Sequence, residues 1–250
     1  MLSKKFLEGS ANFAHKALGI SIIIPTLNEA SYLRNTMEHA LRVADNTDHL
    51  ELIVIDAGSN DRTLETIEHL NCIVISRPDF KLQKHKSLNY GIEIAQHEIV
   101  LFLDADTLLP ESFDVHILTA LQQKGVVGGA FGMRFTDPDT KLWLLSLLNS
   151  CRYRLWKTFY GDQAIFCKKE SAIAAGGFPD SLMEAAHFCK SLLKEGKLKL
   201  LEDKVSTSPR RFRENGFWKV LWFDVRMWTR FVFNLDLKEP KTRYWKTNLQ

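Results

Sequence analysis

The fold of this chain is constrained most strongly by four short apolar runs that are rich in β-branched residues. Each run is followed by apolar residues at helical spacing. Runs of this kind suit strands that are buried on both faces. They are ISIIIPT (20–26), LELIVIDAGS (50–59), CIVIS (72–76) and EIVLFLDAD (98–106), with helices expected at 29–44, from about residue 61, at 82–95 and at 111–123. Strands that alternate with helices predict an α/β fold: a mostly parallel central sheet with right-handed crossovers, flanked by helices.

The alternation weakens after residue 125. Further strands are expected at 126–135, within 161–170 and at 197–203, further helices at 141–159, before Gly176 and Gly177, at 182–195 and at about 217–233, and a basic loop at 204–216. No linker rich in Pro, Gly or Ser interrupts the pattern. We therefore expect an N-terminal extension over 1–18 and a single domain over 19–250 that contains an aromatic-rich, amphipathic C-terminal helix.

Composition excludes several classes of protein. Of the 250 residues, 45% are hydrophobic and 25% charged, which is typical of a folded globular chain, and the net charge of +3 gives no indication of nucleic-acid binding. No segment has the apolar length of a signal peptide or of a membrane-spanning helix, which needs about 18 residues. The four cysteines, Cys72, Cys151, Cys167 and Cys189, form no C-x-x-C pair, which favours reduced thiols. We therefore expect a cytoplasmic protein.

Polar residues stand where three of the expected parallel strands end: Pro25 and Thr26, then Asp56, then Asp104 with Asp106. Ligands of such sheets bind beyond the carboxyl ends of the strands. Asp104 and Asp106 would point the same way along an extended strand, and two neighbouring carboxylates repel unless a cation or proton lies between them. The pair suits Mn²⁺ or Mg²⁺ that also holds phosphate oxygens. The alternative is a solvated turn with an aspartate that caps the next helix.

Several nearby residues have both a binding and a structural interpretation. Asp56 can accept hydrogen bonds from a base or from ribose hydroxyls. Asn28, which precedes Glu29 at the entrance of the first helix, and Asp61 are equally suited to cap helices. Lys84 shares a helix with Asn89 and has the charge to face a phosphate, although most helix lysines are solvated.

Four segments together resemble family 2 glycosyltransferases of the GT-A fold: SIIIPTLNEA, LIVIDAGSNDRT, KHKSLNYGI and VLFLDADTLLP, in this order and spacing. GGAFGMRF, YGDQAIFCKKESAIAAGGFP and SPRRFRENG are similar to a narrower bacterial branch, so the resemblance covers about residues 19–216. It implies an enzyme that takes a sugar from a nucleoside-diphosphate sugar, commonly a UDP-sugar, and passes it to an acceptor hydroxyl, usually with inversion.

The resemblance also implies roles for individual residues. Pro25, Thr26, Glu29 and Asp56 would hold the base and ribose, with Asn28 beside them and Lys84 near the nucleotide. Asp104 and Asp106 would contact the ribose and the metal-bound diphosphate. Arg210, Arg211 and Arg213 would stabilise phosphate if their loop folds over the site, or would be surface charges. Acceptor specificity would depend on residues 131–160 and 180–216.

The catalytic base is the point at which the resemblance fails. An inverting transferase needs a group within hydrogen-bond reach of the acceptor proton. The family usually supplies it from a Glu-Asp pair shortly after a GGF segment, and here Glu184 is followed by Ala185. Glu184 itself, or Asp162, Asp180 or His187, would act as the base, or else the chain binds donor and transfers poorly.

The expected C-terminal helix has two interpretations. Lys219, Arg226 and Arg230 fall on one narrow stripe and aromatic residues cover most of the rest. Such a helix can lie in a membrane interface, or it can pack on the sheet with its aromatics in the core. Membrane contact would make a lipid-linked acceptor and a location at the inner face of the membrane plausible.

The sequence also bears on three rival classes of protein. A sugar-phosphate nucleotidyltransferase would carry a Gly-rich phosphate loop after the first strand, and PTLNEA has no glycine. A phosphorelay receiver rarely needs a chain this long. A nucleotide-sugar-binding protein with weak or lost transferase activity is supported by Ala185 alone.

Overall fold

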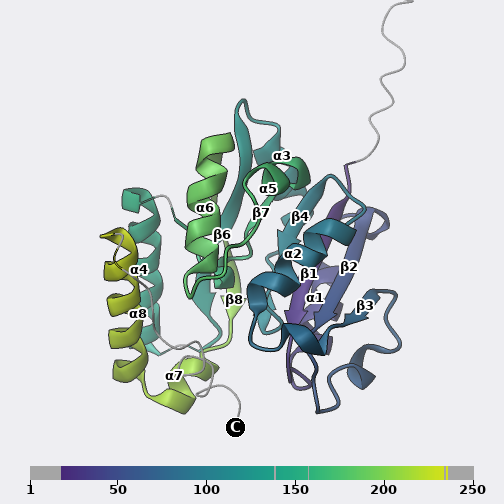
Figure 1. The fold of residues 1–250 in the computed structure, drawn as a ribbon, viewed down its shortest axis with the longest axis horizontal. Helices are drawn as coiled ribbons and strands as arrows, with labels where there is room; N and C mark the ends of the chain where they lie inside the picture. Colours follow the sequence, from purple (N-terminus) through teal and green to yellow (C-terminus); the bar gives the residue numbers. More distant parts are fainter. Residues whose placement is uncertain (1–17, 138, 157, 234, 236–250) are drawn as a thin grey trace, which may run out of the picture.

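The strands of the described part of the chain join one mixed sheet in the order β3-β2-β1-β4-β7-β6-β8-β5 (Figure 1). The computed structural model describes residues 18–137, 139–156, 158–233 and 235. The strands are β1 (Ile20–Thr26), β2 (Leu50–Asp56), β3 (Ile73–Ser76), β4 (Ile99–Phe102), β5 (Thr107–Leu108), β6 (Val126–Phe135), β7 (Phe166–Lys168) and β8 (Lys197–Thr207). β1 to β4 are mutually parallel, β6 is parallel to β8, and β7 and β5 run antiparallel to their neighbours. The predicted mostly parallel α/β sheet is confirmed.

Helices cover both faces of this sheet because alternate residues of a buried strand point to opposite sides. The helices are α1 (Leu33–Val43), α2 (Lys84–Ile94), α3 (Phe113–Leu121), α4 (Thr140–Trp156), α5 (Lys169–Ala174), α6 (Glu184–Glu195), α7 (Arg210–Asn215) and α8 (Phe217–Val232). Ile22 and Ile24 of β1 pack in one apolar cluster with α1 and α3. Ile23, between them, packs in a second cluster with α2 and α6. The sheet is therefore buried on both sides.

The predicted convergence of strand ends is found, with one correction. Thr26 is the register partner of Asp56 where β1 and β2 end. The fourth strand, however, ends at Phe102, so Asp104 and Asp106 do not alternate along an extended strand. They lie in a turn in which the Thr107 N–H donates to the Asp104 carbonyl at 3.1 Å. The turn still brings both carboxylates to the carboxyl edge of the sheet.

Two further expectations were wrong. The helix expected from about residue 61 is absent from that described segment, which holds only a 3₁₀ turn at Glu65–Ile67. Asp61 accepts instead from the Thr63 and Ala30 N–H groups, at 3.0 and 3.3 Å, which favours a loop over a helical start. The basic loop at 204–216 is the end of β8 followed by α7, because Thr207 pairs with both β6 and β5.

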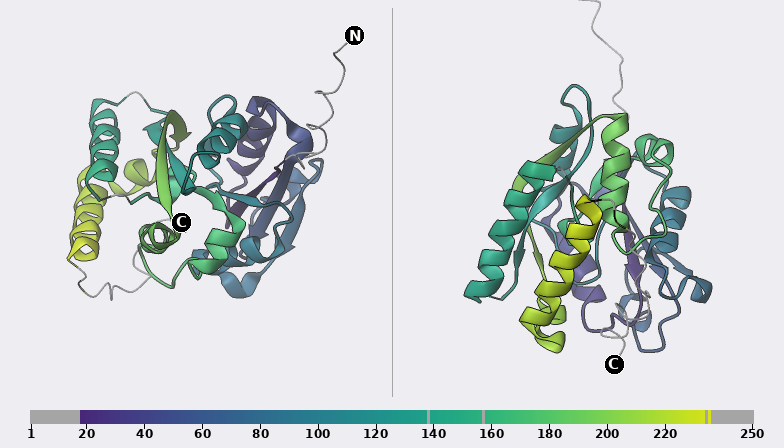
Figure 2. Two further views of the ribbon diagram at one scale, coloured as in Figure 1. Left: turned by 90° about the horizontal axis from the view of Figure 1, so that it is seen from above. Right: turned by 60° about the vertical axis from the view of Figure 1, so that its left-hand side comes forward.

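Helices α4 and α8 lie side by side at the end of the molecule remote from β3 (Figures 1 and 2). On α8, Val220, Met227 and Phe231 are buried while Trp218 and Trp222 are exposed, so the helix packs on the protein with one side and leaves aromatics at the rim. Within the described residues, no helix is long and apolar enough to cross a membrane. The extension predicted over 1–18 lies, except for Leu18, outside the described residues.

The cysteines of the described part agree with the expectation of reduced thiols. Cys72, Cys167 and Cys189 are free, and the last two are fully buried. The Cys151 side chain lies outside the described part.

Gly128 and Gly129, near the start of β6, allow the close approach of its neighbours. A Cβ at Gly128 would lie 2.6 Å from the Phe166 carbonyl oxygen of β7, and one at Gly129 would lie 2.1 Å from the Lys199 carbonyl oxygen of β8. Both contacts are with backbone atoms, which cannot move without disturbing the sheet.

We expect Gly129→Ala to lower the free energy of unfolding by about 3 kcal/mol or more, because the added methyl group overlaps a strand carbonyl. For a chain of this size each kcal/mol lowers the melting temperature by about 2–4 °C. Thermal unfolding followed by circular dichroism measures this. Val127→Ala, which adds no atom, is the control, and equal stability of the two variants would contradict the packing described.

Candidate functional site

The loops that follow β1 and β2 are locked together by side chains that accept backbone hydrogen bonds. The Asn28 N–H donates to Ser59 Oγ at 2.9 Å, the Asn60 N–H donates to Asn28 Oδ1 at 2.9 Å, and the Glu29 N–H donates to Thr63 Oγ1 at 2.8 Å. Asn28 has a left-handed backbone with φ of 56°, a conformation that asparagine tolerates. Asn28 is therefore not the cap of α1, which begins at Leu33. It joins the two loops.

Asp56 ends β2 and is only 1% exposed. Its carboxylate accepts from the backbone N–H of Gly58 at 3.1 Å and from the N–H and hydroxyl of Ser59. Pro25 and Thr26 lie beside it at the end of β1. The residues expected to hold the base and ribose are thus adjacent, and Asp56 shapes the loop that surrounds them.

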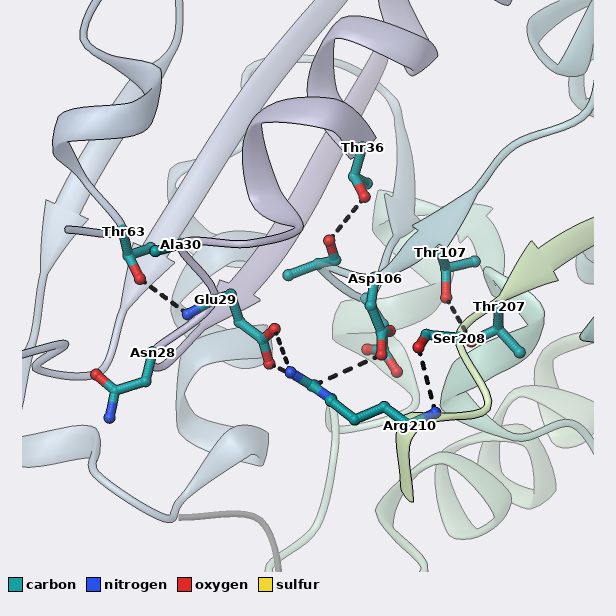
Figure 3. Close-up of polar contacts among 12 residues, drawn as sticks. Asn28, Glu29, Ala30, Thr36, Thr63, Asp106, Thr107, Thr207, Ser208 and Arg210 are labelled. Atoms are coloured by element: carbon teal, nitrogen blue, oxygen red, sulfur yellow. Dashed lines mark hydrogen bonds and ion pairs between the residues drawn. The ribbon is translucent and has the colours of Figure 1, made fainter. Parts of the chain in front are cut away.

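The Asp104–Asp106 turn is held from two sides (Figure 3). Thr36 of α1, itself buried, donates its hydroxyl to the Ala105 carbonyl at 2.7 Å. On the other side, Thr107 Oγ1 bonds Thr207 Oγ1 of β8 at 3.1 Å. Buried hydroxyl groups with satisfied hydrogen bonds fix the backbone, so the two carboxylates are presented in a fixed orientation.

Lys84 neutralises the first of these carboxylates. Its Nζ lies 2.5 Å from Asp104 Oδ1, and both side chains are only partly exposed. The backbone of Gly161 closes over the pair, because a Cβ there would lie 3.3 Å from Lys84 Nζ. Lys84 is therefore drawn into the site rather than solvated.

Arg210 joins the second carboxylate to the loop after β1 (Figure 3). Its guanidinium donates Nη1 and Nη2 to the two carboxylate oxygens of Glu29 at 2.9 and 2.8 Å, and Nη2 lies 3.5 Å from Asp106 Oδ2. Its Cζ also lies 4.9 Å from the ring centroid of Tyr32. The helix start after β8 thus reaches back across the sheet edge to the first loop.

Burial and the neighbouring carboxylates make the ionised form of Asp106 less favourable. Burial, the Asp104 carboxylate and Glu29 raise the pKa of Asp106 to about 7, while Arg210 and Lys84 oppose the rise. The ionised form is therefore less favourable here than in water, and more positive charge at this point would relieve it.

The donor set suits a hard divalent cation, because carboxylate oxygens are the ligands that Mg²⁺ and Mn²⁺ prefer. Among the described residues, no three His, Cys, Asp or Glu side chains gather into a metal cage. A cation at Asp106 would therefore need further oxygen ligands from a bound diphosphate or from water.

Glu184 begins α6 and lies within electrostatic range of the same pair. Burial raises the pKa of its carboxyl, the Lys84 ammonium opposes the rise, and Asp104 adds to it. Ala185 is 7% exposed and packs in the apolar cluster of α2 and α6. The family's Glu-Asp pair corresponds to Glu184 and Ala185 in this chain. Glu184, at the first of these two positions, is therefore the residue that interacts with Lys84 and Asp104.

The other candidate bases have different surroundings. Asp162 lies in the 3₁₀ turn Gly161–Gln163, directly after Gly161, whose backbone lies close to Lys84. Asp180 lies 3.5 Å from His85 Nδ1, with most of its side chain exposed. His187 contacts Ser181 and Met183 through Nδ1 and packs edge-on against Phe231 of α8.

Of the three arginines, the structure brings only Arg210 to this cluster. Arg211 bonds Asp224 of α8 at 2.6 Å, and Arg213 bonds Asp137. Arg211 therefore fastens α7 to α8.

Asn89 and Gln163 support the site, and neither was expected to do so. Asn89 donates to the Phe178 carbonyl at 2.9 Å and accepts from the Phe178 N–H at 2.7 Å, while Gln163 binds the Phe131 carbonyl and the Tyr160 N–H. Phe178 stacks on Phe188 of α6, with ring centroids 4.0 Å apart. Asn89 thereby connects the helix of Lys84 to the segment that leads to Glu184. The only sequence signal was its place on the same helix as Lys84.

A family model described as "Glycosyl transferase family 2" matches residues 21–178, well over half of the chain. The chain belongs to glycosyl transferase family 2. Among curated relatives, "Probable glycosyltransferase YdaM" of Bacillus subtilis is 27% identical over 84% of this chain and 54% of its own length. The "Undecaprenyl-phosphate 4-deoxy-4-formamido-L-arabinose transferase" of Shewanella sediminis is 30% identical over 42% of this chain and 34% of its own length. The chain thus spans about a third to a half of these relatives.

Solved glycosyltransferases share the fold, which is the GT-A fold. A mannosyltransferase from Pyrobaculum calidifontis in complex with GDP-Man and Mn²⁺ matches with a TM-score of 0.63 and 22% identity, over 76% of this chain and 57% of that one. TarS of S. aureus in complex with UDP-GlcNAc matches with a TM-score of 0.59 and 19% identity, over 76% and 58%.

We expect Asn89→Asp to lower the free energy of unfolding by about 1–3 kcal/mol, because a carboxylate cannot donate to the Phe178 carbonyl and leaves it unsatisfied. Chemical denaturation of the variant and of wild type measures the difference. Glu93→Gln, at an exposed position of the same helix, should change stability by less than about 0.5 kcal/mol. An Asn89→Asp protein as stable as wild type would contradict the anchoring role.

Proposed function

We propose that this chain transfers a sugar from a nucleoside-diphosphate sugar to an acceptor hydroxyl, with a divalent cation and with inversion. The observation that carries the proposal is the Asp104–Asp106 turn at the carboxyl edge of the sheet, with Lys84 on one carboxylate and Arg210 beside the other. Membership of family 2 and the GT-A fold support it. A UDP-sugar is the donor expected from the resemblance.

In this proposal the loops after β1 and β2 hold the nucleoside, and the acidic turn holds the diphosphate end. A divalent cation would neutralise the diphosphate as it leaves, with Asp106 as its protein ligand and Asp104 close by. Arg210 offers two parallel N–H donors that suit a pair of phosphate oxygens as well as the Glu29 carboxylate. Glu29 thus keeps Arg210 oriented toward the site until the donor arrives.

Glu184 is the base that we favour, because its carboxyl interacts with Lys84 and Asp104 at the same edge of the sheet. Burial raises its pKa, which brings a carboxylate closer to the basicity that proton removal from a hydroxyl needs. Its ionised form would accept the acceptor proton as the new glycosidic bond forms.

The donor can be identified by thermal stabilisation. The melting temperature is measured with UDP, GDP, TDP or CDP, each in the presence of Mn²⁺ or of EDTA. We expect one of these nucleotides to raise it only when Mn²⁺ is present, because a ligand that binds the native state stabilises that state by mass action. Asp106→Asn should lose this response and Arg211→Ala, whose partner is Asp224, should keep it. Equal stabilisation of Asp106→Asn and wild type would contradict the metal site.

Replacement of the base should separate binding from transfer. We expect Glu184→Gln to lower kcat by about 10²–10⁴-fold while donor affinity changes little. Asp162→Asn and Asp180→Asn, matched changes at the competing positions, should retain most of the activity. Unchanged kcat in Glu184→Gln would exclude Glu184 as the base.

The pH profile gives a second test. Because the base must be ionised and burial raises the pKa of Glu184, kcat/KM should fall as the pH drops through this raised pKa. The loss should therefore begin at a higher pH than the ordinary glutamate value of 4.5. A profile flat down to that value would contradict the assignment.

The same assays separate the alternative, a nucleotide-sugar-binding protein without transferase activity. Such a protein would be stabilised by nucleotide and metal but would neither transfer sugar nor slowly hydrolyse the donor. One relative is named for an undecaprenyl-phosphate substrate, and a lipid-linked acceptor is therefore the first class to screen.

A further inference from the structure

The exposed tryptophans of the described residues, Trp143, Trp218 and Trp222, all lie on α4 and α8. They are 64%, 70% and 73% exposed. On α8, Trp218, Trp222 and Val225 follow one another at spacings of four and three residues, so they lie on one side of the helix. Phe233, exposed just beyond its end, continues this side. The opposite side, with Val220, Met227 and Phe231, is buried.

Helix α4 adds a second apolar stripe to the same end of the molecule. Its exposed side chains are Trp143, Leu144, Leu147 and Leu148, while Leu142 and Ser146 are buried. The two helices run side by side in both figures (Figures 1 and 2), and Lys141 of α4 lies 5.9 Å from the ring centroid of Phe217 of α8. We call the exposed apolar residues of this end of the molecule the α4/α8 surface: Trp143, Leu144, Leu147, Leu148, Trp218, Trp222, Val225 and Phe233. Exposed apolar side chains gathered on two adjacent helices (Figure 1) indicate a binding surface rather than ordinary scatter.

Basic residues outnumber acidic ones on these two helices. Together they contain six basic residues, Lys141, Arg152, Arg154, Lys219, Arg226 and Arg230, and one acidic residue, Asp224, which pairs with Arg211. Lys219 and Arg226 are exposed on α8 beside the side that carries Trp218 and Trp222. The segment 236–250, outside the described residues, contains four basic residues and two acidic ones: Lys238, Lys241, Arg243 and Lys246, with Asp236 and Glu239.

The charge of this surface favours an anionic membrane over a second copy of the chain as its binding partner. A two-fold dimer brings the same patch of both copies together, so two surfaces on which basic residues outnumber acidic ones would face each other. Anionic phospholipid head groups carry the opposite charge to this basic surface, and Trp side chains suit the boundary between head groups and acyl chains. Neither helix can cross a bilayer, so the contact would be one in the plane of the membrane.

We propose that the α4/α8 surface docks on the face of an anionic phospholipid bilayer. The apolar stripes of both helices enter the head-group region, and the cations beside them contact lipid phosphates. This contact does not depend on the donor chemistry proposed above, so binding to vesicles can be tested without any activity.

The test is flotation of the full chain with vesicles of phosphatidylcholine alone or mixed with phosphatidylglycerol. Wild type should float with the mixed vesicles, and added salt should weaken this binding because it screens the charges. The double variant Trp218→Ala/Trp222→Ala should bind at least about tenfold more weakly. Ile173→Ala, which removes an exposed apolar side chain of α5, is the matched control and should bind like wild type.

Two further measurements keep the proposal falsifiable. Trp143→Ala/Leu147→Ala, on the other helix, should weaken binding in the same way, and phosphatidylcholine with brominated acyl chains in the mixed vesicles should quench the tryptophan emission of wild type. Failure to float with anionic vesicles, or unchanged binding of both double variants, would overturn the proposal. So would a dimer in sedimentation velocity that Trp218→Ala/Trp222→Ala dissociates, because a second copy would then cover the surface.

Discussion

Three carboxylates meet at the carboxyl edge of the sheet, and two cations hold them there. Asp104 is paired with Lys84, and Glu29 and Asp106 share Arg210. These charges are only partly exposed, and removing a charge from water is costly unless it is paired, so the loops that carry these residues must keep their relative positions. The hydroxyl contacts of Thr36 and Thr207 and the interlocked loops after β1 and β2 serve this requirement. The arrangement leaves negative charge at Asp106 only partly neutralised, as the metal–diphosphate site that we propose would require.

The site is assembled from segments far apart in the chain. Glu29 follows β1, Lys84 begins α2, Asp106 follows β4, and Arg210 begins α7 after β8. The C-terminal elements are therefore part of the site. Because Arg211 fastens α7 to α8 through Asp224, the residue next to Arg210 is connected to the helix that we propose to dock on membranes. Donor binding at Arg210 and membrane contact at α8 would act on one continuous element.

The sequence predicted the sheet and the convergence of its polar strand ends, because continuous apolar runs and helical spacing report burial directly. The family resemblance named Glu29, Lys84 and Asp104, which the structure brings together. What sequence alone could not predict depends on tertiary contacts. The Asp104–Asp106 turn is held by Thr36, from another element, whose hydroxyl donates to the Ala105 carbonyl. The helix expected after Asp61 gives way to a loop because Asp61 bonds Ala30, 31 residues away. Arg210 contacts Glu29 and Asp106, whereas Arg211 contacts Asp224. This difference depends on the residue at which α7 begins, which the spacing of the basic residues in the sequence does not predict.

The central claim is that Asp106 and a bound nucleoside diphosphate share a divalent cation at the edge of the sheet. Crystals grown with Mn²⁺ and the nucleotide that stabilises the chain, measured at an X-ray wavelength where manganese scatters anomalously, test it most directly. The account predicts an anomalous peak in contact with the Asp106 carboxylate and with the diphosphate, and Arg210 within hydrogen-bond distance of a phosphate oxygen. A nucleotide bound elsewhere, or bound at this edge without manganese at saturating Mn²⁺, would contradict it.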